Sequence, residues 1–232
     1  MDGNGRWATR RGLPRTAGHR EGVESVRRII EAAPELGVGT LTLYAFSSDN
    51  WKRPGPEVAA LMTLFRRHLR EETAKLKKAG VRLTFIGRRD RLPEAVRAAA
   101  VRSEWETRHG DRLLLRLAVD YSSRAALEQA ARLHATTGTP FGTCLHEATG
   151  GPPAPPVDLL VRTGGEQRLS DFLLWESAYA ELLFLDTLWP DVTGETLAEA
   201  LGRFHARERR FGGLPVEPVG GDGARTVSLP TA

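Results

Sequence analysis

Cysteine occurs only once in the 232 residues, as Cys144. A single thiol excludes an intramolecular disulfide and a zinc site built from cysteines, and it is typical of a reducing cytoplasm. No secretory signal pattern opens the chain, and its most apolar stretch, residues 172–188, is interrupted by the carboxylates Glu176, Glu181 and Asp186. We therefore expect a soluble cytoplasmic protein without a membrane-spanning helix.

The motifs of common nucleotide enzymes are also missing. No Gly-x-x-x-x-Gly-Lys-Ser/Thr loop is present, which argues against P-loop chemistry. Gly3, Gly5 and Ala8 match the loose dinucleotide fingerprint, but no strand precedes them within the chain, so a dinucleotide-binding oxidoreductase is a weaker hypothesis. The net charge is only +4, and a GC-rich genome accounts for most of the excess of arginine over lysine, so we expect no nucleic-acid partner.

Hydrophobic periodicity alternates between helix and buried strand along the chain. Apolar residues at helical spacing predict helices, and short β-rich runs predict interior strands. The expected helices are 19–36, 58–76, 93–109, 123–134 and one around 197–204, and the expected strands are 40–46, 81–86, 113–119 and 157–161. This order predicts a single α/β domain with a mainly parallel central sheet flanked by helices.

Polar clusters follow three of the expected strands, at residues 47–51, 120–124 and 162–166. Ligands of parallel α/β sheets bind beyond the carboxyl ends of the strands. We therefore expect these clusters to meet at one mouth of the sheet.

The opening octet, Met1 to Ala8, contains what a diphosphate needs. Asp2 supplies a carboxylate for Mg²⁺, Gly3 and Gly5 leave backbone amides open, and Arg6 is a fixed cation. Arg15 and His19 follow closely enough to reach the same site. The alternatives are a helix N-cap for Asp2, a solvated surface group for Arg15 and a structural histidine for His19.

Two further clusters carry candidate residues. In the first, Ser47 and Asn50 could orient a proton or a water, and Arg53 could stabilise a leaving diphosphate. Trp51 considered alone is better interpreted as a core aromatic residue. In the second, two arginines and a hydroxyl across a Gly-Gly turn predict another diphosphate pocket, with a second carboxylate for Mg²⁺ further along; these are Arg162, Arg168, Ser170 and Glu181. The alternative for Glu181 is a buried ion pair, and Glu57 could simply be a favourable charge at a helix N-terminus.

With these clusters in order, residues 1–213 resemble the cis-prenyltransferase family of the undecaprenyl diphosphate synthase type. The motifs that carry the resemblance are the opening octet, Gly18–Gly22, Ala45–Pro54, Val161–Glu166, Phe172–Trp175, Ala178–Leu182, Leu188–Asp191 and Arg207–Gly213. Residues 214–232 lose periodicity and are expected to form a disordered tail. The all-helical prenyl synthases are excluded, because the chain has no Asp-Asp-x-x-Asp cluster.

The resemblance implies roles for individual residues. The counterpart of Asp2 binds Mg²⁺ with help from that of Glu181, and the counterparts of Asn50 and His19 position groups around ionisation and proton removal. By the same resemblance, the allylic diphosphate site consists of Gly3, Asn4, Gly5, Arg6, Trp7, Arg15, His19, Ser47, Trp51 and Arg53. Isopentenyl diphosphate is bound by the counterparts of Arg162, Arg168 and Ser170. The counterpart of Arg209 reaches into a neighbouring subunit, which implies a homodimer.

The implied activity is Mg²⁺-dependent condensation of isopentenyl diphosphate with geranyl or farnesyl diphosphate to give a cis-polyprenyl diphosphate. The product would need an apolar tunnel lined by helix 58–76 and strand 113–119, and peripheral membrane contact would serve its release. Two alternatives stay open. One is a non-catalytic partner subunit, and the other is an enzyme of specialised metabolism with a short or irregular product.

The chain departs from the family pattern in two places. Members usually carry a strand before the opening aspartate, so we expect the first strand of the sheet to be missing, its neighbours to have unpaired backbone groups, and the start to be misplaced at an internal methionine. The segment Asp120-Tyr121-Ser122-Ser123 stands where the family usually has Asn-Tyr-Gly-Gly. This change brings a carboxylate to the expected position of the diphosphates and predicts an altered product.

Overall fold

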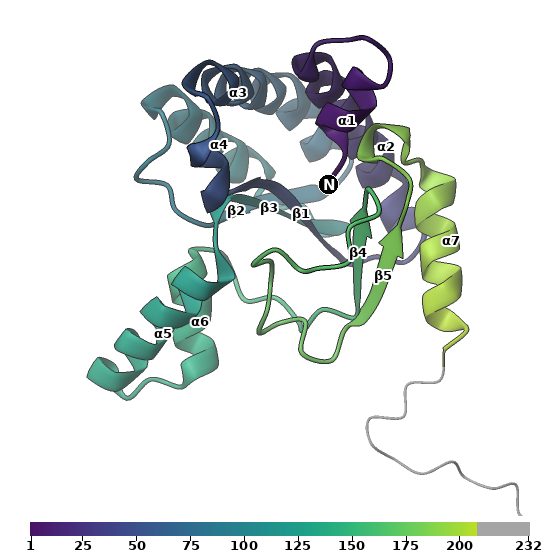
Figure 1. The fold of residues 1–232 in the computed structure, drawn as a ribbon. Helices are drawn as coiled ribbons and strands as arrows, with labels where there is room; N and C mark the ends of the chain where they lie inside the picture. The colour runs from purple at the N-terminus through teal and green to yellow at the C-terminus, as the bar shows by residue number, and fades with distance from the viewer. Residues whose placement is uncertain (208–232) are drawn as a thin grey trace, which may run out of the picture.

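The computed structural model describes residues 1–207 (Figure 1). The expected tail at 214–232 and the candidate Arg209 lie outside the described residues. The elements are α1 (Asn4–Thr9), α2 (Arg15–Glu35), β1 (Thr40–Ser47), η1 (Ser48–Lys52), α3 (Gly55–Lys78), β2 (Val81–Ile86), α4 (Glu94–Thr107), β3 (Leu113–Tyr121), α5 (Ser123–Thr137), α6 (Phe141–Thr149), β4 (Leu159–Thr163), β5 (Glu181–Leu185), η2 (Trp189–Asp191) and α7 (Gly194–His205).

Every strand pair in the described part is parallel. β3 lies between β1 and β2, with Leu43 opposite Leu117, and β4 pairs with β5 as a second, two-stranded sheet. Helices flank the strands, which confirms the expected α/β architecture with parallel strands (Figure 1).

Most of the expected elements are present with small shifts at their ends. β4 extends to Thr163 rather than ending at 161, because its ladder with β5 continues to the pair Thr163 and Leu185. Arg162 is therefore a strand residue and does not follow the strand. The sequence patterns did not predict α1, α6 and β5.

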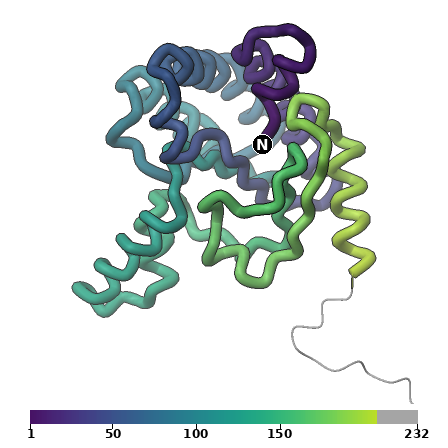
Figure 2. Tube along the Cα trace, in the orientation of Figure 1, coloured from purple at the N-terminus to yellow at the C-terminus, as the bar shows by residue number. Residues whose placement is uncertain are grey.

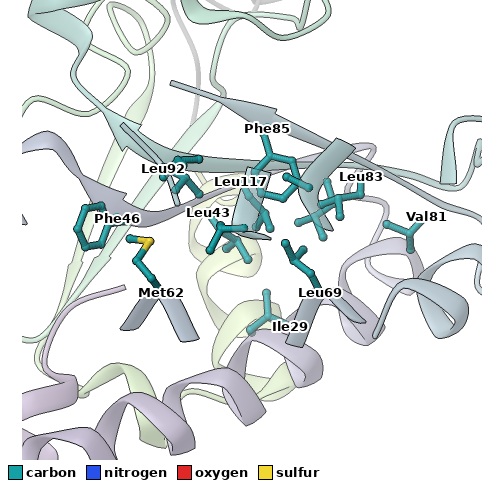
Figure 3. Close-up of a cluster of buried hydrophobic side chains, with 14 of the residues drawn as sticks. Ile29, Leu43, Phe46, Met62, Leu69, Val81, Leu83, Phe85, Leu92 and Leu117 are labelled. Carbon is teal, nitrogen blue, oxygen red and sulfur yellow. The ribbon is translucent and has the colours of Figure 1, made fainter. Parts of the chain in front are cut away.

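The main core lies between α2 and α3 on one side and the three-stranded sheet on the other (Figure 3). α3 buries one face at the spacing Val58, Met62 and Leu69, and this face meets Leu43 and Phe46 of β1. Burial of one such side chain contributes about 2 kcal/mol. The amphipathic pattern of the helix therefore fixes it against the sheet with its basic face outward.

The hairpin of α5 and α6 projects from the rest of the molecule (Figures 1 and 2). It has a small apolar cluster of its own, formed by Ala126, Ala130, Cys144 and Leu145. Ser122 caps the start of α5 by accepting a hydrogen bond from the amide of Ala125, and α5 ends at Gly138 in the left-handed conformation. Within the described part, no helix combines the length and the apolar character needed to cross a bilayer.

Candidate active site

Hydrogen bonds fix the backbone of Asp2 between β4 and η2. The hydroxyl of Thr163 accepts from the Asp2 amide and donates to the Asp2 carbonyl, both at 3.0 Å. The amide of Trp189 donates to the same carbonyl at 2.9 Å. Gly3 follows with φ of 100°, and a Cβ there would lie 2.7 Å from the side chain of Leu188, so only glycine fits.

The carboxylate of Asp2 connects the opening turn to the later arginine cluster. Arg162 donates to Asp2 Oδ2 at 3.1 Å, and Arg6 lies 3.6 Å from Oδ1. Burial raises the pKa of Asp2, but the hydrogen bonds from Arg162 and the Gly3 amide, with the charges of Arg162 and Arg6, outweigh burial and hold the pKa below its usual value. Asp2 is therefore a carboxylate at neutral pH.

The later cluster gathers around Arg162. Its guanidinium donates to Ser170 Oγ at 2.7 Å and to the backbone carbonyl of Arg168. The side chain of Arg168 instead donates to Glu166 at 2.5 Å, and Glu166 also lies 4.0 Å from Arg6. Arg162 and Ser170 are thus brought together beside the opening turn, whereas Arg168 meets Arg162 through its backbone carbonyl and directs its guanidinium to Glu166.

Two arginines and one histidine surround Glu57 in the first turn of α3. Arg53 donates to Glu57 at 3.0 Å, and Arg15 and His19 each lie 3.8 Å from it. Gly5 allows the Arg15 guanidinium to approach the opening turn, since a Cβ at position 5 would lie 2.7 Å from Arg15 Cζ. Glu57 therefore acts here as the anion that holds the cations together.

His19 is neutral at pH 7. Burial lowers its pKa, the Arg53 and Arg15 charges lower it further, and the opposing effect of Glu57 is too small to compensate. His19 Nε2 is buried and has no hydrogen-bond partner within the described residues.

Ser47, Asn50 and Trp51 lie in and before η1, directly after β1. The Ser47 side chain accepts from the Asn50 amide while Asn50 Oδ1 accepts from the Ser47 amide at 3.2 Å, so both polar side chains take part in a capping box. The Trp51 ring packs edge-on against Phe46 with ring centroids 5.2 Å apart. Trp51 therefore packs against the core, as expected for this aromatic residue when it is considered alone.

Two candidates are not drawn into this cluster. The Trp7 indole donates to Asp191 at 2.7 Å and anchors α1 on η2. Glu181 begins β5 and is paired with Arg207, with no hydrogen bond or ion pair to Asp2 among residues 1–207. The same residues contain no group of three or more His, Cys, Asp or Glu side chains that could hold a metal by themselves.

The sequence predicted that the Asp120 carboxylate lies close to the diphosphates, but the structure buries it elsewhere. Its side chain is 0% exposed and accepts both arms of the Arg91 guanidinium, with Nε at 2.8 Å. The Arg91 guanidinium in turn lies over the Trp51 ring, 5.6 Å from its centroid. The charge of Asp120 is thus neutralised inside the fold, and Asp120 does not line the cavity described next.

A cavity of about 1430 Å³ begins at the polar cluster and continues into the core. Its polar lining includes Asp2, Asn4, His19, Ser47, Asn50, Arg53, Arg162 and Ser170, and its apolar lining includes Ile29, Leu61, Met62, Leu69, Leu83 and Leu117. The cavity also extends along β1 and β4, which both line it.

Sequence reasoning missed two residues of the site. Thr163 holds the backbone of Asp2, and Glu166 binds both Arg6 and Arg168. Both lie in the stretch Arg162–Glu166, in which the sequence motif pointed to Arg162 as the only diphosphate ligand. A threonine directly beside a candidate phosphate ligand at the end of a strand is the signal that could have found Thr163.

Comparisons with known proteins agree with this geometry. A family model described as "Putative undecaprenyl diphosphate synthase" matches residues 1–212. Isoprenyl transferase 1 of Bradyrhizobium diazoefficiens is 60% identical over 215 residues, which are 92% of this chain and 87% of the relative. The ditrans,polycis-undecaprenyl-diphosphate synthase ((2E,6E)-farnesyl-diphosphate specific) of Haemophilus ducreyi is 44% identical, covering 92% of this chain and 91% of that protein.

Among solved structures, lavandulyl diphosphate synthase from Lavandula x intermedia, in complex with dimethylallyl diphosphate, superimposes with a TM-score of 0.86. The two chains are 32% identical, and the match covers 91% of this chain and 95% of the other. The chain therefore belongs to the undecaprenyl diphosphate synthase family and is a cis-prenyltransferase.

Proposed function

We propose that the protein condenses isopentenyl diphosphate with an allylic prenyl diphosphate, geranyl or farnesyl, in an Mg²⁺-dependent reaction that yields a cis-polyprenyl diphosphate. The observation that carries the proposal is the 3.1 Å contact between Asp2 and Arg162. It joins the opening glycine turn and the Arg162 cluster, the two anion sites of the proposal, at the mouth of one mainly apolar cavity. Two diphosphates and one growing hydrocarbon chain require this combination of surfaces.

In this proposal the allylic diphosphate binds at the opening turn. Arg6, Arg15 and Arg53 supply fixed positive charge, and Asn4 and Gly5 supply backbone amides at the start of α1. Glu57 is then the stand-in for the diphosphate, because it already holds Arg15, His19 and Arg53 within 4 Å. Charge that develops on the departing diphosphate is stabilised by these cations once the diphosphate takes the place of Glu57.

Isopentenyl diphosphate binds at Arg162, Arg168 and Ser170. Fixing both substrates supplies the proximity term of the reaction, because the double bond of one is held near the allylic carbon of the other. Asn50 and the neutral His19 line the same mouth and orient groups around the proton that is lost.

The residues present fit a magnesium ion held jointly with substrate. Asp2 is ionised and its side chain is 38% exposed, so one carboxylate faces the cavity mouth. Mg²⁺ typically uses one or two protein carboxylates and completes its shell with waters and substrate phosphates. When bound, the ion would neutralise diphosphate charge as a Lewis acid. Glu181 pairs with Arg207 at the opposite end of the β4–β5 ladder from Thr163, which holds Asp2, so the proposal assigns the ion to Asp2 and the substrate phosphates.

The hydrocarbon chain of the product is proposed to occupy the cavity between α2, α3 and the sheet. The lining there is mainly apolar, although His68 and Glu72 also contribute to it. Removing prenyl carbons from water is favourable by about 0.8 kcal/mol per buried CH₂ group. Release of a long apolar product to a membrane surface belongs to the same proposal.

A homodimer completes the proposal, as the resemblance implies. Trp175 and Leu182 are 55% and 38% exposed, and they are large apolar side chains that a subunit contact would cover. Size-exclusion chromatography with light scattering should give twice the chain mass. A Trp175→Glu variant should shift the protein toward the monomer.

The test is turnover of labelled isopentenyl diphosphate with geranyl or farnesyl diphosphate. We expect a butanol-extractable product with Mg²⁺ and none after EDTA treatment. Asp2→Ala should lower kcat/KM by about a hundredfold or more, since it removes the carboxylate at the centre of both sites. The matched control is Asp90→Ala, which should leave kcat/KM unchanged, because this exposed carboxylate pairs with Arg88 and does not line the cavity. No turnover of any primer by the unmodified chain would favour a non-catalytic partner subunit instead.

A second candidate is irregular coupling of short prenyl units. It is favoured by the TM-score of 0.86 against lavandulyl diphosphate synthase. Incubation with dimethylallyl diphosphate alone distinguishes the two, because regular chain elongation requires isopentenyl diphosphate. Mass spectrometry of a product formed without isopentenyl diphosphate would support irregular coupling.

A further inference from the structure

Four residues other than glycine have left-handed φ within residues 1–207, and they gather where the end of β3 meets the segment 170–174. They are Asp120, Ser170, Asp171 and Leu173, with φ of 51°, 49°, 62° and 45°. A side chain disfavours this conformation, so it persists only where surrounding contacts hold it. The contacts that hold segment 170–174 matter for the site, because Ser170 belongs to the Arg162 cluster.

Ser122 and Ser123 supply those contacts. The Ser122 hydroxyl donates to Asp171 Oδ2 at 2.5 Å, and Ser123 Oγ accepts from the Leu174 amide at 3.0 Å. The backbone adds two bonds, from the Ser123 amide to the Asp171 carbonyl at 3.0 Å and from the Arg124 amide to Asp171 Oδ1 at 2.7 Å. Both serine hydroxyls are thus bound to one turn of the chain.

Ser170 connects this turn to Arg162 of the proposed anion site. Its hydroxyl accepts from Arg162 at 2.7 Å, and its carbonyl accepts from the Tyr44 hydroxyl at 3.4 Å. Phe172 stacks on the Tyr44 ring with centroids 4.4 Å apart and planes 10° from parallel. The turn is therefore held by the serines at one end, by Tyr44 in the middle and by Arg162 at the site.

We propose that Ser122 and Ser123 are positioning residues for isopentenyl diphosphate, an inference that rests on the proposed function of the Arg162 cluster. Their hydroxyls fix the left-handed turn at residues 170–173 and so set where Ser170 meets Arg162.

The test uses the double variant Ser122→Gly/Ser123→Ala, which removes both hydroxyls. Glycine is chosen at 122 because it is nearly as good as serine at the N-cap of α5. The matched control is Gly138→Ala, which strains the other end of α5 at φ of 68° without touching the turn. Hydrogen exchange at the Leu174 amide and the two substrate KM values are measured for each protein.

We expect faster exchange at Leu174 and a KM for isopentenyl diphosphate raised about tenfold in the double variant, the effect of weakening one charge-assisted hydrogen bond. The KM for the allylic diphosphate and kcat at saturation should stay within about twofold of the unmodified chain, and Gly138→Ala should change neither KM. In a Ser170→Ala background the double substitution should raise the KM no further, because the serines act through Ser170.

An unchanged KM for isopentenyl diphosphate, or equal increases in both KM values, would overturn the inference while the proposed function stands. Absence of turnover in the unmodified chain would instead refute the proposed function. The inference is then decided by calorimetry with inorganic pyrophosphate. Its Kd must rise in the double variant and rise no further in the Ser170→Ala background.

Discussion

Asp2 and Arg162 show how single residues tie distant parts of the chain into one site. The two lie 160 positions apart, and each has further partners that fix it: Thr163 holds the Asp2 backbone, and Ser170 holds the Arg162 guanidinium. Because a guanidinium forms several hydrogen bonds in fixed directions, lysine could not replace Arg162 in this network. The arrangement is preorganised before any ligand binds.

Asp120 is the buried residue whose replacement tests the fold rather than the chemistry. Asp120→Asn keeps the shape but removes the charge that receives both arms of Arg91. We expect the free energy of unfolding to fall by about 2 kcal/mol, the range for a hydrogen bond to a charged group. Urea denaturation measures it, with the exposed Asp90→Asn as the control that should leave stability unchanged. A loss no larger than that of the control would mean that Arg91 finds another partner.

His19 makes stability depend on pH in a definite direction. Because its pKa is lowered in the folded state, the unfolded chain binds the proton first as the pH falls below 6.5. His19 therefore lowers the free energy of unfolding progressively from pH 6.5 down through its folded pKa. His19→Gln should remove this contribution, so urea unfolding at pH 7.5 and 5.5 should differ less than in the unmodified chain. An equal or larger pH dependence in the variant would contradict the assignment of His19 as neutral.

At the scale of elements, the contact of α1 with α2 positions the opening turn. A Cβ at Gly18 would lie 1.9 Å from the Asn4 carbonyl oxygen, and one at Gly22 would lie 2.2 Å from Asn4 Oδ1. The backbone of α2 therefore meets the backbone of α1 at Gly18 and the Asn4 side chain at Gly22. Asn4, Gly5 and Arg6 owe their position to glycines one helix away.

Gly18→Ala should destabilise the protein by about 3 kcal/mol, because an overpacked contact against backbone cannot relax by rotating a side chain. Activity should fall as well, since α1 must shift. The matched control is Gly202→Ala in α7, which has nothing within 4 Å and should stabilise that helix by up to about 1 kcal/mol. Thermal unfolding measures both, and a Gly18→Ala protein as stable as the unmodified chain would refute the close packing.

The helices and strands with strong periodicity could be predicted from the sequence, and the rest could not for physical reasons. α2 and α3 have apolar residues repeated at helical spacing, which makes them recognisable in the sequence. α1 has only six residues, too few for such a repeat, and it is held by its contacts with α2. β5 was read only as an apolar stretch, because a short run of apolar residues fits a strand or a helix equally well.

Within the site, charged residues in motifs could be predicted, and their partners could not. Arg162 and Ser170 meet as expected from a Gly-Gly turn. The grouping of Glu57 with Arg15, His19 and Arg53, or the pairing of Asp120 with Arg91, depends on how elements pack. Spacing along the chain does not contain that information.

At the scale of the whole molecule, a cavity extends from the cluster around Asp2 into the core between the sheet and the two long helices. Leu61 of α3 lines it, while the adjacent Ala60 is exposed. Leu61→Trp should shorten the polyprenyl product by occupying space that the growing chain needs, with little effect on the first condensation. Ala60→Trp adds the same indole outside the cavity and should leave product length unchanged. Mass spectrometry of the products decides, and identical products from both variants would place the chain elsewhere.

The projecting α5–α6 hairpin has a practical consequence. Its connection at residues 138–140 joins the two helices, and a Cβ built at Gly138 would meet no atom within 4 Å. A fluorescent domain spliced into this loop would extend away from the sheet and from the contact of Asp2 with Arg162. The enzyme could thus be labelled internally, with neither of its ends altered.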